Sequence, residues 1–179
     1  MNTLKKIIQI VVPLFLIGFV TACEEPKEIS SFHPNHWEDH YIESEALSRK
    51  RASLENGKTY LSIYSNIYSF SLKNPQNLTA IASLRNVSVT DTIYISKADY
   101  YNTKGQLIRN YFEKPIFLKP LETVEIIIDE FDEQGGSGAN FIFEWATNPT
   151  TPEPLFEAIM TSLRGSQGLS FTMQGKRIE

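Results

Sequence analysis

Apolar and polar side chains alternate with a period of two from residue 58 to the end of the chain. Such alternation is typical of β-strands that bury one face. The apolar positions are Leu61, Ile63 and Ile67; Leu78, Ala80, Ala82 and Leu84; Ile93, Ile95, Ala98 and Tyr100; Val124, Ile126 and Ile128; Phe141, Phe143 and Trp145; Phe156, Ala158 and Met160; and Leu169, Phe171 and Met173. The pattern predicts about eight short strands.

The alternation slips by one position near Ser96 and Lys97. An extra residue in one strand of an antiparallel pair has this effect, so we predict a β-bulge there. Turn-forming residues cluster at 74–75, 102–105, 115–120, 135–138 and 149–154. Short strands at this spacing, with no helical period between them, predict an all-β fold: a single immunoglobulin-like β-sandwich domain over 58–179. A small barrel is the main alternative.

The first 23 residues have the order of a secretory signal. Lys5 and Lys6 precede an apolar run over 7–20, and small residues lead to Cys23, the only cysteine. Pro13 and the short length argue against a membrane span. The segment 20–23 resembles the lipobox of bacterial lipoproteins, which implies a signal peptide over 1–22 and a lipid, such as palmitate, on Cys23. With one cysteine, no internal disulfide can form.

Residues 23–57 are mostly polar and have few side chains able to build a core. We predict a flexible tether. Residues 44–56 have helix signals, with Ser44 as a cap and Asn56-Gly57 as a stop. A helix docked on the domain and a disordered stalk both fit the pattern.

Net charge argues against nucleic-acid binding. The full chain has a charge of −4, and removal of residues 1–22 leaves 15 basic against 21 acidic residues. A net charge of −6 lacks the basic patch that nucleic-acid binding needs.

The predicted domain contains no histidine and no cysteine after residue 58. A Ser-His-Asp triad, a cysteine nucleophile and a His or Cys zinc site therefore cannot be built within it. The three histidines, His33, His36 and His40, all lie in the predicted tether, where they are weak candidates for a metal site.

An acidic run followed by glycines is the first choice for a ligand-facing loop. Its candidate residues are Asp129, Asp132, Glu133, Gly135, Gly136, Ser137, Gly138 and Asn140. Carboxylates on a tight loop can bind calcium, and successive glycine amides can form an anion-binding nest. A connection whose glycines supply positive φ and whose acids are solvated is the alternative.

Two other groups of residues were candidates for chemistry or binding. Glu144 and Glu157 lie within apolar strands and would suit glycosidase chemistry if they faced each other. The alternation predicts that Glu144 points outward. Tyr60, Tyr64 and Tyr68 form a possible binding stripe, although strands are also rich in tyrosine for packing alone.

Several motifs in order resemble a bacterial family called domain of unknown function 3124. They are 60–68 (YLSIYSNIY), 77–86 (NLTAIASLRN), 99–105 (DYYNTKG), 114–115 with 118–121 (LKPL), 135–145 (GGSGANFIFEW), 157–160 (EAIM) and 167–172 (QGLSFT). The resemblance implies a short exported protein, often a lipoprotein, and no established activity, cofactor or catalytic residues. The chain departs from it near Ile63, Ser65 and Asn66, where the family has a Pro and a His.

Together these features predict a lipid-anchored binding or structural module of the cell envelope that uses no cofactor and is not an enzyme. The alternative is a calcium- or carbohydrate-dependent activity of the acidic loop. The expected partners are the membrane, through the Cys23 lipid, and an envelope protein or glycan. Because Glu24 follows Cys23, the outer membrane is favoured in a Gram-negative host, with the domain facing the periplasm or the surface.

Overall fold

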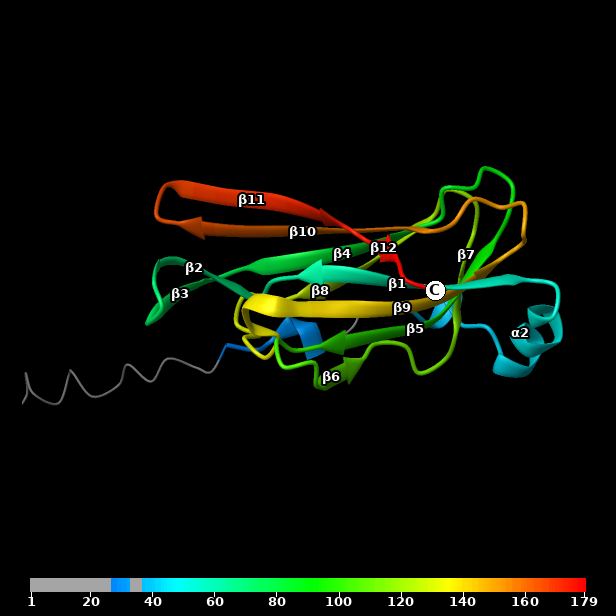
Figure 1. Ribbon diagram of the computed structural model, residues 1–179, viewed down its shortest axis with the longest axis horizontal. Coiled ribbons are helices and arrows are strands. Elements are labelled where there is room, and N and C mark those ends of the chain that lie inside the picture. Colours follow the sequence, from blue (N-terminus) through cyan, green and yellow to red (C-terminus); the bar gives the residue numbers. More distant parts are fainter. Residues whose placement is uncertain (1–26, 33–36) are drawn as a thin grey trace, which may run out of the picture.

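The computed structural model describes residues 27–32 and 37–179 of the chain (Figure 1). The predicted signal peptide, Cys23, His33 and His36 lie outside these residues. Within the described part, no helix is long and apolar enough to cross a membrane.

Two antiparallel sheets form the body of the molecule. The first contains β1 (Glu55–Ile63), β5 (Ile93–Tyr101), β6 (Leu107–Asn110), β7 (Ile116–Leu118), β9 (Ala139–Thr147) and β12 (Lys176–Arg177), in the order β12-β1-β9-β5-β6 with β7 also paired to β5. The second contains β4 (Thr79–Arg85), β8 (Thr123–Ile128), β10 (Leu155–Arg164) and β11 (Gln167–Gln174), in the order β11-β10-β4-β8. A separate hairpin joins β2 (Asn66–Ser71) and β3 (Asn74–Asn77).

The inner faces of the two sheets share one core, and a stack of aromatic rings crosses it. Ring centroids lie 4.9 Å apart between Tyr100 and Phe141, 5.2 Å between Phe141 and Phe143, and 4.4 Å between Phe143 and Phe156. Phe156 belongs to the second sheet and the other three to the first, and all four are fully buried. The molecule is therefore a sandwich, as the alternation predicts; the immunoglobulin-like assignment stays a prediction.

The predicted bulge is present in β5. Its register with β9 shifts between Ile95 and Lys97, so that the apolar set continues with Ala98 on the core side. Each of the seven predicted apolar segments overlaps a strand, and the sequence pattern missed the short strands β3, β6, β7 and β12.

One predicted turn is wrong, and a second is only partly correct, since Pro120 does lie in a turn. Asn74 and Pro75 belong to β3, and the turn before them is formed by Leu72 and Lys73. Strand β3 tolerates Pro75 because its only neighbour is β2, so one side of the strand needs no backbone donor. Residues 116–118, inside the predicted turn at 115–120, form β7 because Ile116 and Leu118 are apolar and fill the core.

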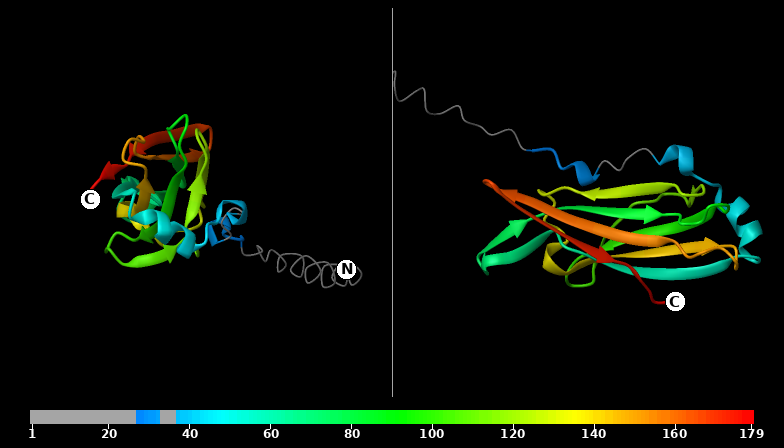
Figure 2. Two further views of the ribbon diagram at one scale, coloured as in Figure 1. Left: turned by 90° about the vertical axis from the view of Figure 1, so that its right-hand side faces the viewer. Right: turned by 90° about the horizontal axis from the view of Figure 1, so that it is seen from above.

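Several residues of the predicted tether pack on the sandwich. Trp37 is 5% exposed and forms an edge contact with Phe112, and Tyr41 makes a bridge to Ile116. The 3-10 turn η1 (Ser30–Phe32) lies beside β8, and the 3-10 turn η2 (Glu38–His40) lies beside β7. Figure 2 shows this segment running along one side of the sandwich. The sequence predicts a flexible tether here, whereas Trp37 and Tyr41 of its described part contact the sandwich.

Helix α2 (Ser44–Arg51) is the docked helix that the sequence left open. Leu47 buries its side chain against Tyr94 and Ala146. The helix ends well before Gly57, which the sequence pattern took as its stop. Gly57 instead pairs with Trp145 in β9, whose ring would be 2.3 Å from a Cβ at this position. The close approach of the indole, and not helix termination, requires glycine.

Candidate functional site: a polar groove beside the acidic loop

Asp132, a predicted ligand-facing residue, is buried and bound by the chain itself. Its Oδ2 accepts hydrogen bonds from Arg109 at 2.9 Å and from the Ser31 hydroxyl at 2.8 Å. The side chain of Asp132 is 0% exposed and that of Arg109 is 13% exposed. Arg109 also donates to the Tyr111 hydroxyl at 2.6 Å. The carboxylate therefore forms a buried ion pair with Arg109 and holds η1 through the hydrogen bond from Ser31.

Asp129 has a similar role nearer the surface. Its Oδ2 accepts bonds from the Ser30 hydroxyl at 2.6 Å and the Ser30 amide at 3.3 Å, and its Oδ1 accepts one from the Phe131 amide. Partial burial raises the pKa of Asp129, but these bonds outweigh it and leave the pKa below its ordinary value. Both aspartates thus hold the segment that precedes the domain.

The glycines of the loop are packed against neighbouring segments. A Cβ on Gly135 would lie 2.0 Å from the Tyr100 hydroxyl, and Gly136 has a φ of +72°. The Gly138 amide donates to Thr103 Oγ1 at 2.9 Å, and the Gly136 amide donates to the Glu133 carbonyl. The amides of Gly136 and Gly138 therefore already have partners within the chain, which argues against a nest of successive free amides. Ser137 lies in η3 (Gly136–Gly138).

These contacts favour the structural interpretation of the loop over a calcium site. The oxygens of Asp129 and Asp132 that would bind the ion accept hydrogen bonds instead. Asn140 is separated from them, since it lies in β9 and pairs with Ser62 and Tyr101. Among residues 27–32 and 37–179 there is no group of three or more His, Cys, Asp or Glu side chains that could hold a metal. His40, the one predicted histidine candidate among the described residues, instead has its Nε2 3.0 Å from Glu122 Oε1.

The other two acids of the run, Glu130 and Glu133, line a groove of about 490 Å³. The β2–β3 hairpin, the acidic loop and the end of β10 form its walls. The lining residues are Asn74, Pro75, Gln76, Asn77, Glu130, Glu133, Ser162 and Leu163. Of these residues, the sequence pattern indicates only Glu133 as a candidate. The 74–77 segment was missed because an Asn-Pro pair is typical of a turn, although its density of amides was a usable signal.

The lining of the groove defines the ligands that it suits. Asn77 Nδ2 donates to Glu133 Oε1 at 2.7 Å, which orients the carboxylate. Amides both donate and accept hydrogen bonds, and carboxylates accept two or more, so the set matches a ligand with many hydroxyl or amino groups. No lysine, arginine or histidine lines the groove, and two carboxylates do. An anionic ligand would therefore be repelled.

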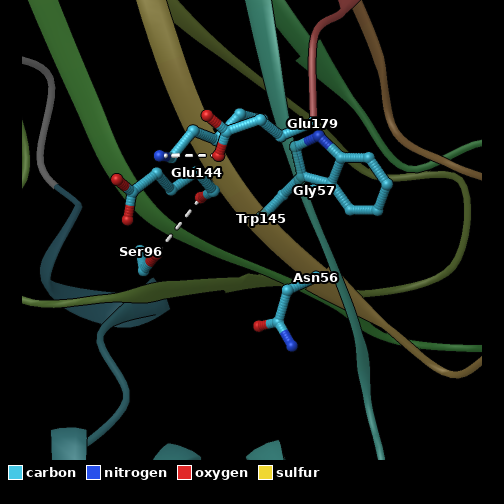
Figure 3. A pocket seen from close by; sticks show the side chains of 7 residues that line it. Asn56, Gly57, Ser96, Glu144, Trp145 and Glu179 are labelled. Carbon is cyan, nitrogen blue, oxygen red and sulfur yellow. Dashed lines mark hydrogen bonds and ion pairs between the residues drawn. The ribbon is translucent and has the colours of Figure 1, made fainter.

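A second, smaller hollow of about 110 Å³ lies around Glu144 (Figure 3). Gly57, Trp145 and Ser96 line it, and Lys58 and Glu179 form an ion pair of 2.8 Å at its side. The Glu144 carboxylate lies 3.4 Å from Lys97. The hollow is a gap in a surface charge network next to the β5 bulge, and it offers little space for a ligand.

Glu144 and Glu157 do not form a catalytic pair. Glu144 lies on the outer face of the first sheet, as the alternation predicts, whereas Glu157 lies on the outer face of the second sheet in an ion pair with Arg85 at 3.1 Å. The whole core separates the two carboxylates. Glycosidase chemistry, which needs both beside one bond, has no support at these positions.

The tyrosine stripe is also divided. Tyr60 lies in β1 and is 36% exposed, Tyr68 lies in β2 and is 57% exposed, and Tyr64 lies between the strands, packed edge-on against Phe171. The chain bends at Ser65 between the two strands, and Tyr64 packs on the second sheet instead of standing free beside the other two rings.

Comparisons with known proteins place the chain in a family without a described activity. No protein with a curated description matches it. A solved structure, the crystal structure of Thermotoga maritima 1070, is similar with 9% identity and a TM-score of 0.44, over 67% of this chain and 92% of that chain. The model of the family described as "Protein of unknown function (DUF3124)" matches residues 56–178. The chain therefore belongs to the DUF3124 family.

Proposed function

We propose that this protein is a lipid-anchored binding module of the bacterial cell envelope and that its groove binds a neutral or amine-bearing, hydroxyl-rich ligand such as an envelope glycan. The observation that carries the ligand proposal is the lining of the groove: three side-chain amides and two carboxylates, without a cation, from three segments of the fold. The lipobox-like segment and the preceding signal pattern support the anchor.

The groove suits recognition better than catalysis. Its acids are Glu130 and Glu133, and Glu133 already accepts a bond from Asn77. The other polar side chains of the lining are three amides and Ser162, which donate and accept hydrogen bonds. A shallow polar surface of this kind suits many weak hydrogen bonds to one extended ligand.

The ligand proposal is tested by titrating the protein with three probes: neutral N-acetylglucosamine oligomers, amine-bearing glucosamine oligomers and a polyanionic glycan, each followed by calorimetry. We expect heat from the first two that the Glu130→Gln/Glu133→Gln variant loses. Glu113→Gln, an exposed acid in the β6–β7 connection, is the matched control and should bind normally. Equal binding of the polyanion, or unchanged binding by the double variant, would contradict the proposal.

The anchor is tested separately by growing expressing cells with radiolabelled palmitate. We expect label in the wild-type chain and none in the Cys23→Ala variant, which should also keep its first 22 residues. In a Gram-negative host the labelled protein should fractionate with the outer membrane. An unlabelled wild-type chain would refute the anchor and leave the groove proposal intact.

A further inference from the structure

Strand β11 forms an open edge of the second sheet. It pairs with β10 from the Glu157·Gln174 pair to the Arg164·Gln167 pair without a register shift. Within the described ranges, no other strand pairs with its second side. Figure 1 shows β11 along the upper margin of the sandwich, and the views in Figure 2 place the β10–β11 hairpin at the same margin.

The sequence of β11 lacks the features that usually protect an edge. Its eight residues, QGLSFTMQ, contain no charge and no proline. Proteins normally blunt an edge strand with lysine, proline, a bulge or short length, because unpaired backbone groups recruit other strands. The opposite edge strand, β8, contains Glu125. An unprotected, regular edge of this length is a surface that fits another strand.

The backbone of β11 presents a defined set of donors at this edge. The Gly175 amide donates inward, to the Phe156 carbonyl at 2.7 Å. Because the hydrogen-bonding direction alternates along an antiparallel strand, Phe171 also bonds to β10. Ser170 and Thr172 therefore point their amides and carbonyls away from the sheet, where an added strand would bond.

The side chains of β11 leave the margin of the core partly uncovered. Leu169, Phe171 and Met173 face the interior and pack on the core, yet each stays partly exposed. Tyr64 covers part of Phe171, with ring centroids 5.8 Å apart. An added strand that carried apolar residues at the same alternate positions would extend the sheet and cover this margin.

We propose that two copies of this chain pair through β11, antiparallel, with the two-fold axis at Phe171. In this register Ser170 and Thr172 of one copy form hydrogen-bonded pairs with Thr172 and Ser170 of the second copy. Leu169 faces Met173 of the second copy, and the two Phe171 rings meet. Each copy supplies four strands, so the second sheet becomes continuous across the dimer.

A second copy fits this edge because β11 is complementary to itself. With the axis at Phe171, Leu169 of one copy faces Met173 of the other, and Ser170 faces Thr172. Apolar residues therefore meet apolar ones, polar residues meet polar ones, and the strand has no charges that could repel. An isologous interface needs this self-complementarity, whereas a strand from an unrelated protein does not. A monomeric chain that captures a foreign extended peptide is the competing outcome.

The test is sedimentation velocity of the full chain, purified in a mild detergent, over a range of concentrations. The Ser170→Lys/Thr172→Lys variant would place like charges opposite each other twice. The Ser170→Lys/Thr172→Glu variant would place opposite charges there instead. Ser170 and Thr172 are exposed, so both variants should fold, which circular dichroism checks. Thr123→Lys, at the exposed start of β8, is the control for added charge.

We expect a wild-type dimer, a dissociation constant raised about tenfold or more by the like-charge variant, and a dimer in the opposite-charge variant and in Thr123→Lys. Wild-type chains that stay monomeric at every concentration would overturn the proposal. So would a dimer that the like-charge variant leaves unchanged, or one that the opposite-charge variant also abolishes, because each would place the contact elsewhere or in another register.

Discussion

Asp132 and Glu133 are consecutive acids that the fold uses in different ways. Asp132 is fully buried and bound to Arg109 and Ser31, whereas Glu133 is exposed at the groove and bound to Asn77. The same division separates Asp129, which holds Ser30, from Glu130, which lines the groove. Similar charges in one run thus stabilise the fold at two positions and form a candidate binding surface at two others.

Asp132→Ala should give the largest effect because it leaves the Arg109 guanidinium buried without its carboxylate. We expect a loss of about 3 to 5 kcal/mol in the free energy of unfolding, measured in urea. Glu133→Ala, the exposed neighbour, should change it by less than about 0.5 kcal/mol. Equal losses of unfolding free energy at the two positions would show that burial is not what makes Asp132 more important for stability than Glu133.

The second largest effect should come from alkaline pH, which should destabilise the protein through the buried phenol of Tyr100, near Asp132. Burial raises the pKa of Tyr100 to about 12, a bond from Ser65 opposes the shift, and the charge of Asp132 adds to it. The unfolded chain then loses the Tyr100 proton above pH 10, before the folded chain does, so stability is complete below pH 10 and falls up to about pH 12.

The loss for Tyr100 should total roughly 3 kcal/mol, from a shift of about two pH units. Burial raises the pKa of Tyr111 as well, so the wild-type slope contains both phenols. Urea unfolding at a series of alkaline pH values should therefore show a shallower slope for Tyr100→Phe than for the wild type. Identical slopes would contradict the assignment to this ring.

Ser31→Ala should have a smaller effect, because it removes one bond to a buried charge and keeps the ion pair. We expect a cost of about 1.5 kcal/mol and faster tryptic cleavage after Lys27. Ser30→Ala, which removes the exposed bond to Asp129, is the control and should increase cleavage less. The opposite ranking would mean that Asp129, and not Asp132, holds the segment.

Asp129 should give the smallest effect, and the effect should disappear in acid. Because its folded pKa lies below its ordinary value, the stability that it contributes is present above that value and falls as pH drops through the folded pKa. The melting temperature of Asp129→Asn should lie below that of the wild type at neutral pH, and the gap should narrow as the pH falls below the ordinary carboxyl pKa of 3.8. A gap independent of pH would rule out the carboxylate charge as its cause.

The fold was largely readable from the sequence because burial imposes its period on each strand. Alternation located the long strands, and the slip at Ser96 and Lys97 located the bulge. The short strands β3, β6, β7 and β12 were missed because two to four residues are too few to show a period. Trp37 was assigned to a tether because one apolar residue among polar ones predicts no core, although it packs on Phe112.

The sequence by itself determined the family, the strands with their period of two, and the acidic loop next to its glycines. Only the tertiary structure decided which acids of that loop are available to a ligand. Asp129 and Asp132 are bound because Ser30, Ser31 and Arg109 come to them from distant parts of the chain. Charge and spacing are local properties of a sequence, whereas the partner that neutralises a charge is chosen by packing across many residues.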